Sequence, residues 1–484
     1  MADMTPQEQL MLELINRARM DPNAEAARYG ISLNEGLAAG TISATPKQVL
    51  AGNDSLAAAA GNHANWMLIH NSMVHNETGG TGFTGSTPQD RMTAAGYVFD
   101  GPSWWNGENI AAAGTSDPMT DALATQFIID QERSLFVDDF DNGRGHRLNI
   151  LSEKFQEVGI GQTTGSFAFP EGTFNSSIIT QDFAEAGTKV FITGVIYNDT
   201  VVNDDFFSVG EQTVGCTVSS TGATDTTGAG GGYELLYGSG GAKSVAFDLA
   251  GGTVTVGLTL GSTNIKLDVV NGNEVWSDTS ISSISSNVSE LHALGIIGVE
   301  LHAGAGAQHI YGNSANNVLD GGDGTDVAVY DGAFADFNII KNGDGSYTVQ
   351  DKTGAEGTDT VSNIESLQFS DRLYSFAGSA PVLNGDIADQ QAQAGSAFNL
   401  SVPAGLFTDP DNDVLTYTAQ SKWRCIAGLA NVQRGDDDIF GYARQSRCRH
   451  RFRKTHRQRW LAYHSRYIRR DRDRSEYGAR RSRR

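Results

Sequence analysis

Cysteine is nearly absent from this sequence, which has three cysteines in 484 residues. Cys216, Cys425 and Cys448 are too few for a disulfide framework or a cysteine-rich zinc module, so packing or bound metals must stabilise the chain. Charged residues are also scarce at 19%, and there are 10 prolines against 57 glycines. This composition favours short strands and tight turns over a long helical array.

Long apolar runs are missing too. No window reaches the ~18 consecutive apolar residues that a membrane helix needs, so we expect no transmembrane segment. The start, MADMTPQEQLMLELINRARMDP, has no basic region leading into an apolar one, and we therefore expect no N-terminal signal peptide. A chain of this length is expected to form three or four domains.

The first 200 residues contain helix signals followed by strand signals. Thr5 and Pro6 with Glu8 form a capping box, which predicts a helix from about residue 6 to the Asp21-Pro22 stop. Further helices are predicted at about 55–73 and 118–136, and strands in EVGIGQ and SIITQDFAEA. These elements predict an α+β domain in which His63 and His70 are packing residues.

Five polar residues in this region are not required for packing. They are His75 in SMVHNE, Glu108 in GENIA, Asp130 and Glu132 in IIDQERSLF, and His146 in GRGHRLNIL. Two neutral imidazoles supply nitrogen ligands to an ion such as zinc, and nearby carboxylates can orient a bound water or accept its proton. The alternative is a polar cavity in which these groups satisfy each other's hydrogen bonds.

The order of these segments resembles the CAP superfamily, which includes cysteine-rich secretory proteins, antigen 5 and plant pathogenesis-related proteins. The HN segment is followed by Arg91 before an AGY turn, then GENI, an acidic helix, GHRLNIL and a VGIG strand. The resemblance covers about residues 5–200, and LINRARMDP is similar to the bacterial branch. It implies an α/β/α sandwich.

The resemblance also implies a site. In CAP proteins the two histidines, the glutamate of GEN and an acid on the following helix face one cavity, which here implies His75, His146, Glu108 and an acid near residue 130. We favour Glu132 as that acid, because Phe136 follows it by one helical turn, and Asp130 and Asp138 remain alternatives. Ile129 replaces the usual tryptophan of this helix, so the ligand contacts of eukaryotic members are not carried over.

Residues 201–300 are rich in Gly, Ser, Thr and Val and predict antiparallel strands with Asn-Gly turns. From Ala303 three nine-residue units follow, AGAGAQHIY, GNSANNVLD and GGDGTDVAV, with Ile310, Leu319 and Ala328 at the eighth position. This period predicts a short parallel β-roll over residues 301–376 with its following β region.

The units resemble RTX, or haemolysin-type, calcium-binding repeats. The resemblance implies that Asp326 coordinates Ca²⁺ in the third unit, where Gly322 and Gly324 permit the turn and offer carbonyls. Gln308 and Asn317 at the same position of the other units are poorer donors for a hard cation, so we expect one marginal calcium site.

Residues 381–420 resemble the opening of a bacterial cadherin-like or Ig-like domain. Asp409, Asp411 and Asp413 match the FxDPDxD turn of that family, which implies a second group of calcium ligands. Such modules extend or attach a protein.

The last 64 residues differ in charge from the rest. Residues 421–484 hold 20 of the 35 Lys and Arg and six Asp and Glu, a net charge of +14, whereas residues 1–420 carry 15 basic and 51 acidic residues, a net charge of -36. A shifted reading frame can restore segments resembling the missing strands of an Ig-like domain, so we interpret 421–484 as a frameshifted, poorly ordered tail. The alternative is a basic tail that binds nucleic acid or anionic lipid.

Together these observations predict an extracellular or cell-surface bacterial protein, exported by the type I route. Its first domain is expected to bind zinc or a similar ion, together with a small-molecule, lipid or protein ligand, and its repeats to bind calcium. No nucleic-acid partner is inferred. Two alternatives are a metal-dependent hydrolase or peptidase with Glu108 as base, and a non-catalytic surface interaction protein. The absence of HExxH and of a nucleophile elbow argues against the hydrolase.

Overall fold

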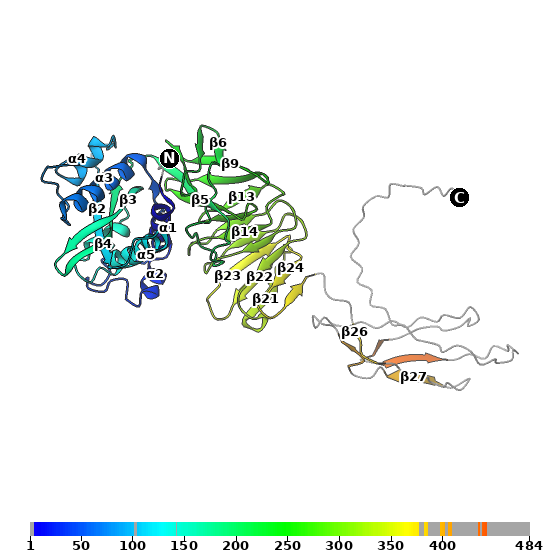
Figure 1. Cartoon of the computed structure of the whole chain (residues 1–484). Coiled ribbons are helices and arrows are strands. Elements are labelled where there is room, and N and C mark those ends of the chain that lie inside the picture. The colour runs from blue at the N-terminus through cyan, green and yellow to red at the C-terminus, as the bar shows by residue number, and fades with distance from the viewer. Residues whose placement is uncertain are drawn as a thin grey trace, which may run out of the picture. The chain divides into compact units, whose positions relative to one another are not determined.

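The computed structural model describes residues 4–100, 104–141, 143–376, 382–385, 397–401, 405–408, 434–435 and 438–442. The chain divides into two compact units, residues 1–374 and 375–484. The first unit contains an N-terminal α/β domain and a large β region (Figure 1).

The N-terminal domain has one sheet with helices on both faces. Its helices are α1 (Pro6–Met20), α2 (Pro22–Arg28), α3 (Asp54–His70), α4 (Pro88–Ala94), α5 (Asp121–Val137) and α6 (Gly145–Ile150). Its strands are β1 (Ala51–Gly52), β2 (Asn106–Thr115), β3 (Glu157–Phe169) and β4 (Gly172–Ala184), in the order β1-β3-β4-β2. Strand β1 runs parallel to β3, and the other pairs are antiparallel.

The first helix follows the local sequence signals. The Thr5 side chain accepts a hydrogen bond from the Glu8 N–H, and the Glu8 carboxylate accepts one from the Thr5 N–H, so the predicted capping box is confirmed. The helix ends at Met20, directly before Asp21-Pro22. The other two predicted helices correspond to α3 and α5, and the predicted strands to β3 and β4.

The residues of the VGIG segment of β3 pack alternately against the two faces of the sheet. A Cβ on Gly159 would lie 2.0 Å from the backbone N of Ala57, and one on Gly161 would lie 2.2 Å from that of Gly61, so these glycines let α3 lie directly on the strand. Val158, before the two glycines, and Ile160, between them, join the core formed with α1 and α5. Figure 1 shows α3 and α1 on opposite sides of the sheet.

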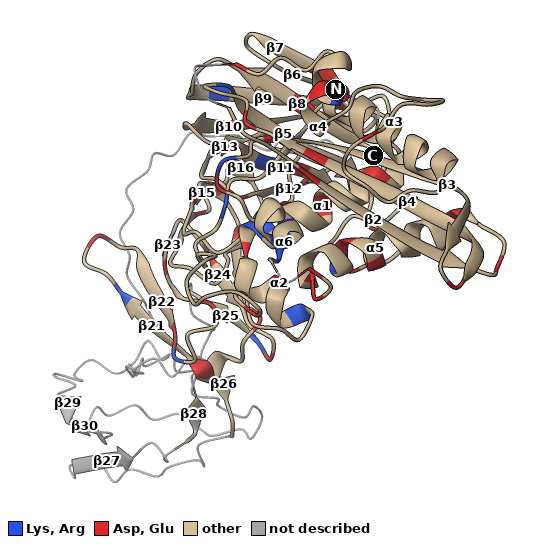
Figure 2. Ribbon diagram, turned by 90° about the vertical axis from the view of Figure 1, so that its left-hand side faces the viewer, with Lys and Arg blue, Asp and Glu red and all other residues tan. Residues whose placement is uncertain are grey.

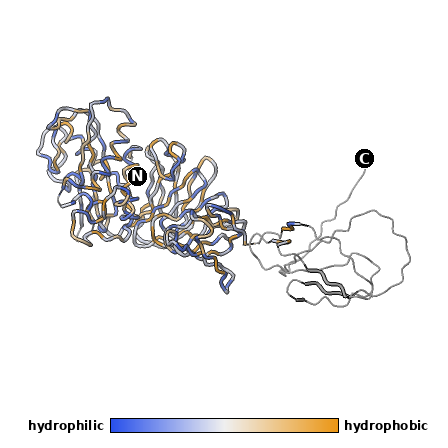
Figure 3. Tube along the Cα trace, turned by 90° about the horizontal axis from the view of Figure 1, so that it is seen from below, coloured by the Kyte–Doolittle hydropathy of each residue, from blue (hydrophilic) through white to orange (hydrophobic). Residues whose placement is uncertain are grey.

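The β region consists mainly of two large sheets. The ten-stranded sheet has the order β21-β22-β23-β18-β15-β13-β10-β9-β6-β7, and the nine-stranded sheet has the order β25-β24-β20-β17-β14-β12-β11-β5-β8. The bounds are β5 (Val190–Tyr197), β6 (Thr217–Ser220), β7 (Ala223–Thr226), β8 (Gly232–Tyr237), β9 (Gly241–Leu249), β10 (Gly252–Leu260), β11 (Ile265–Val270), β12 (Glu274–Ser277), β13 (Ile281–Ile284), β14 (Glu290–Ala293), β15 (Glu300–His302), β16 (Ala305–Gly306), β17 (His309–Tyr311), β18 (Val318–Asp320), β19 (Asp323–Gly324), β20 (Val327–Val329), β21 (Phe337–Lys341), β22 (Tyr347–Asp351), β23 (Thr358–Ser362), β24 (Ser366–Gln368) and β25 (Leu373–Ser375). A short 3₁₀ helix, η1 (Phe334–Asp336), precedes β21. Hydrophobic and hydrophilic residues alternate along much of this region (Figure 3).

From β12 to β20 the strands alternate between the two large sheets, except that β16 and β19 pair in parallel in a separate two-stranded sheet. We call this segment, residues 274–329, the parallel coil, because each strand pairs in parallel with the next strand of its own sheet. Leu301 pairs with Leu319, and Ile310 pairs with Ala328, each eighteen residues further along. Ile310, Leu319 and Ala328 are fully buried, as the repeat pattern predicts.

Helix α1 contacts both the N-terminal sheet and the β region. Lys266 on β11 donates to Glu13 of α1, and Asn264 donates to the backbone carbonyls of Val49 and Gln156 at 2.9 and 2.7 Å. Strand β5 lies before residue 200, within the segment expected to form the first domain, yet it pairs with β8 and β11 of the nine-stranded sheet. The backbone thus enters the β region directly after β4.

The second unit contains short antiparallel pairings. Strand β26 (Val382–Leu383) pairs with β28 (Phe407–Thr408), and β30 (Asp438–Tyr442) pairs with β27 (Ala397–Ser401) and β29 (Arg434–Gly435). Two of these strands, β29 and β30, belong to the segment interpreted as a frameshifted tail. Asp409, Asp411 and Asp413 lie outside the described residues.

Acidic residues are spread over the N-terminal domain and the β region (Figure 2). Within the described ranges, no helix combines the length and hydropathy that crossing a membrane requires.

Candidate functional site

His75 lies on the segment that follows α3 and is held by Glu108 of β2. Its Nδ1 lies 2.8 Å from Glu108 Oε1. Arg91 of α4 binds the other oxygen of Glu108 through its Nη2, and its Nη1 donates to the His75 carbonyl at 3.0 Å. One buried guanidinium therefore positions both the carboxylate and the backbone of the histidine.

His146 is held in the same way by Asp138. Asp138 ends α5 in the left-handed conformation with φ 53°, and its side chain is fully buried. Its Oδ1 lies 2.7 Å from His146 Nδ1, and its Oδ2 accepts the His146 N–H at 2.9 Å. The carboxylate thus both orients the imidazole and caps the start of α6.

The two histidine segments are joined by a pair of asparagines. Asn109 Nδ2 donates to the His146 carbonyl at 3.2 Å, and Asn149 Nδ2 donates to the Glu108 carbonyl at 3.3 Å. Asn149 also donates to Asn109 Oδ1 at 2.9 Å. The GENI and GHRLNIL segments are therefore adjacent, with the histidine–carboxylate pairs on either side of this link.

A second layer of polar groups lies beneath His75. His63 of α3 is fully buried, with Nδ1 3.1 Å from Glu77 Oε1 and Nε2 3.0 Å from the Val74 carbonyl. Burial lowers the pKa of His63, because it disfavours the charged imidazolium form. This arrangement agrees with the prediction that His63 has a structural role.

The charge state of Glu108 follows from its partners. Burial acts to raise its pKa, but the hydrogen bond with His75 and the charge of Arg91 outweigh it, and the pKa of Glu108 is lowered. Asp182 lies opposite Glu108 in the β2–β4 pair, and burial together with the Glu108 charge raises the pKa of Asp182 well above its usual value. The partners of Glu108 thus favour its ionised form, whereas the surroundings of Asp182 favour its protonated form.

The acid favoured from the sequence lies elsewhere. Glu132 is fully buried and accepts a hydrogen bond from the Tyr29 hydroxyl at 2.6 Å, and burial raises its pKa to about 7. Asp130 is exposed and accepts from Gln126. Of the three acids left open by the sequence, Asp138 is the one that contacts a site histidine.

Two site residues were not identified from the sequence. Asp182 interrupts the apolar strand SIITQDFAEA, and a buried acid within such a strand is a signal that reasoning from the sequence could have used. Glu77 stands two residues after His75, and its two oxygens accept from the Thr84 N–H and contact His63.

The candidate calcium ligand Asp326 lies in the turn between β19 and β20. Its Oδ1 accepts the Gln308 N–H at 2.8 Å, while its Oδ2 and the Gln308 Oε1 are buried without a hydrogen-bond partner. Gly322 and Gly324 have φ values of 75° and 154°, which favour glycine, and Gly324 stacks directly on Gly306 of the turn before. Asn317 occupies the equivalent place on the other sheet and accepts the Val299 N–H.

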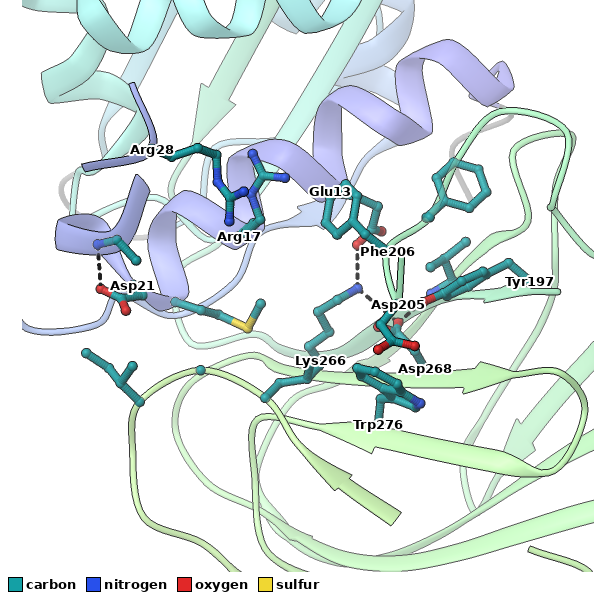
Figure 4. Close-up of a pocket in the computed structure, with 17 residues that line it drawn as sticks. Glu13, Arg17, Asp21, Arg28, Tyr197, Asp205, Phe206, Lys266, Asp268 and Trp276 are labelled. Atoms are coloured by element: carbon teal, nitrogen blue, oxygen red, sulfur yellow. Dashed lines mark hydrogen bonds and ion pairs between the residues drawn. The ribbon is translucent and has the colours of Figure 1, made fainter. Parts of the chain in front are cut away.

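A pocket of about 300 Å³ lies between α1 and the nine-stranded sheet (Figure 4). Lys266 crosses it between Glu13 and Asp268, at 2.6 and 2.9 Å. Aromatic residues Tyr197, Phe206, Phe207 and Trp276 form much of its lining.

Comparison with known proteins identifies the N-terminal domain. Residues 12–168 match the family model described as CAP, the cysteine-rich secretory protein family, so the chain contains a CAP domain. No curated protein matches the chain.

Solved structures also match the chain. One is a crystal structure of an extracellular protein containing an SCP domain from Bacillus anthracis, with 20% identity and a TM-score of 0.22. The match covers 37% of this chain and 40% of that protein, so this chain spans less than half the length of that relative.

Proposed function

We propose that the CAP domain binds one divalent metal ion, zinc or a similar ion, through Nε2 of His75 and Nε2 of His146. The observation that supports this most is the matching state of the two imidazoles. In both, Nδ1 is engaged by a buried carboxylate, Glu108 or Asp138. A carboxylate on one ring nitrogen fixes the tautomer and raises the basicity of the other, an arrangement common around metal-bound histidines.

The same contacts support a positioning role for Glu108 rather than coordination of the ion. Its two oxygens are engaged by His75 and Arg91, so neither is available to a metal without breaking an ion pair. Asp138 likewise uses both oxygens on His146. Two histidine ligands leave coordination positions for water and for a ligand or partner, which we propose to be the role of this site.

The geometry argues against the hydrolase alternative. A general base near pH 7 needs a pKa close to 7, whereas the pKa of Glu108 is lowered and its carboxylate is held by Arg91. We therefore propose binding, not hydrolysis, as the function of the CAP domain, in a bacterial protein that acts outside the cell after type I export.

The metal site is tested by zinc content after dialysis of the full chain. His75→Ala and His146→Ala should each remove one equivalent of zinc, while His70→Ala, at the exposed end of α3, should leave the content unchanged. Unchanged zinc in both site variants would show that the ion is bound elsewhere or not at all.

We further propose that the parallel coil is a β-roll of the RTX kind that binds one Ca²⁺ beside Asp326. The unpartnered Asp326 Oδ2 and Gln308 Oε1 support this, because calcium prefers oxygen ligands and the unpaired oxygens are costly without one. Calcium should raise the melting temperature of the full chain, and Asp326→Ala should abolish the rise. Asp323→Ala, exposed in the same turn, is the matched control.

A further inference from the structure

Two rows of side chains run across the outer face of the parallel coil, where β12, β14 and β17 lie side by side. In the first row Glu274 pairs with Glu290, and Glu290 pairs with His309. In the second row Trp276 pairs with His292, and His292 with Tyr311. Residues two apart on a strand face the same side, so both rows share one surface.

The donor atoms of three of these residues lie close together, and a fourth, His309, lies near one of them. His292 Nε2 lies 3.1 Å from Glu290 Oε2, and His309 Nδ1 lies 4.0 Å from Glu290 Oε1. Glu274, Glu290 and His292 each offer one donor atom, all within 4.8 Å of one another. Ligands about 2.0–2.2 Å from a tetrahedral ion stand roughly 3.3–3.6 Å apart, which falls within this range of spacings.

Stacking fixes the orientation of His292. Its ring lies between those of Trp276 and Tyr311, with centroid distances of 3.9 and 4.0 Å and interplanar angles of 7° on both sides. The ring plane is therefore set before any ion arrives, with Nε2 directed at Glu290. Asn271 Nδ2 donates to Glu274 Oε1 at 2.9 Å and holds the second carboxylate.

Two carboxylates face each other at this place. Glu274 and Glu290 lie opposite each other on adjacent strands, where like charges repel, and a cation between them would relieve that repulsion. A set of two carboxylates and two imidazoles matches the ligands of zinc and copper ions, whereas calcium takes oxygen ligands alone.

We propose that Glu274, Glu290, His292 and His309 bind one divalent transition-metal ion of the zinc and copper class on the outer face of the coil. The ion joins three neighbouring strands, β12, β14 and β17, and stabilises their parallel stacking. This site shares no residue with the pair His75 and His146 or with the turn that contains Asp326.

The first test is zinc titration by isothermal calorimetry of the full chain carrying His75→Ala and His146→Ala, which removes the site proposed for the CAP domain. One equivalent of zinc should still bind. His309→Ala should weaken that binding at least tenfold, and His292→Ala should abolish it. The matched control is His302→Ala on the other sheet, where His302 pairs with Asp320.

The second test uses Cu²⁺ as a spectroscopic probe. Because Trp276 stacks on His292, bound Cu²⁺ should quench its fluorescence, and the quenching should be lost in Trp276→Phe. Electron paramagnetic resonance of the chain carrying His75→Ala and His146→Ala should show two nitrogen ligands, and one when His309→Gln is added. His309 is about half exposed, with 52% of its side chain accessible, so this variant is expected to fold.

Three results would overturn the proposal. They are no zinc binding in the chain that lacks His75 and His146, equal losses in His302→Ala and His292→Ala, and a copper spectrum with no nitrogen ligand. None of them bears on the CAP-domain site, whose own variants are measured with the coil intact. If His292→Ala fails to fold, Glu290→Gln, which keeps a hydrogen-bonding side chain, should show the same loss of zinc.

Discussion

Buried polar groups are arranged in two ways in this protein. In the N-terminal domain each buried polar group has its own partners. Fully buried Arg19, for example, donates to the carbonyls of Gln48 and Ile150, which are distant from it in sequence. In the parallel coil one contact repeats instead. The Gln308 N–H donates to Asp326 one turn ahead, and the Asn317 N–H donates to Asp359 on the other sheet.

This difference has an energetic consequence. A buried charge with its own set of partners has no substitute. Its loss leaves the opposite charge buried and unpaired, and the desolvation penalty of that charge lowers the stability of the whole domain. A repeated side chain–backbone bond stabilises only its own turn and the next, as in other repeat architectures. Substitutions in the two regions should therefore lower the free energy of unfolding by different amounts. Four variants test this, from the largest expected effect to the smallest.

Arg91→Met should have the largest effect. It removes the guanidinium that pairs with Glu108 and holds the His75 carbonyl, and it leaves a buried carboxylate unpaired. The free energy of unfolding, measured by urea denaturation, should fall by about 3–5 kcal/mol. Arg133→Met, at an exposed position of α5, is the control and should change it by less than about 1 kcal/mol. Equal losses of stability in Arg91→Met and Arg133→Met would show that the buried charge of Arg91 has no special importance in the N-terminal domain.

Glu132→Gln should change the pH dependence of stability. The pKa of Glu132 is raised from 4.5 to about 7 in the folded state, so the folded chain holds its proton more tightly than the unfolded chain. The stabilising contribution is complete below about pH 4.5 and is lost as the pH rises toward 7. It amounts to on the order of 2–3 kcal/mol.

The measurement is the difference in unfolding free energy between pH 5 and pH 8. That difference should shrink in Glu132→Gln and stay unchanged in Glu171→Gln, an exposed position between β3 and β4. If Glu132→Gln left the pH dependence of the unfolding free energy unaltered, the raised pKa of Glu132 would be contradicted.

Asn317→Ala should have a smaller effect, because it removes one unit of the repeated contact. Asn317 Oδ1 accepts the Val299 N–H, and Nδ2 donates to the Ala315 carbonyl at 3.0 Å. A loss of about 1–2 kcal/mol is expected in urea denaturation followed by the part of the fluorescence that Trp276→Phe removes, which reports on the coil. Asn338→Ala, exposed on β21, should lose less. A loss as large as that of Arg91→Met would mean that the coil is not locally stabilised.

Thr5→Ala should have the smallest effect. It removes the side-chain cap of α1, a contact local to this helix, and should lower the free energy of unfolding by about 1 kcal/mol. Thr173→Ala, exposed on β4, serves as the control. Equal melting curves for wild type and Thr5→Ala would show that α1 is held by its packing alone.

The sequence by itself determined the local features. The start and end of α1 follow from Thr5 and Asp21-Pro22, and the burial of Ile310, Leu319 and Ala328 follows from a nine-residue period. Such signals depend on neighbours along the chain, so they can be read without the fold. The resemblance to CAP proteins was likewise visible in the order of segments such as GENI and GHRLNIL along the chain.

The tertiary structure alone decided which polar groups meet. Spacing along α5 favoured Glu132, but the left-handed residue that ends this helix places Asp138 against His146, and Glu132 instead faces Tyr29. The two rows of side chains on the coil could not be predicted from the sequence either, because Glu274, Glu290 and His309 become neighbours only when strands stack in register. Contacts between residues distant in sequence depend on that register and on backbone direction, and a local pattern contains neither.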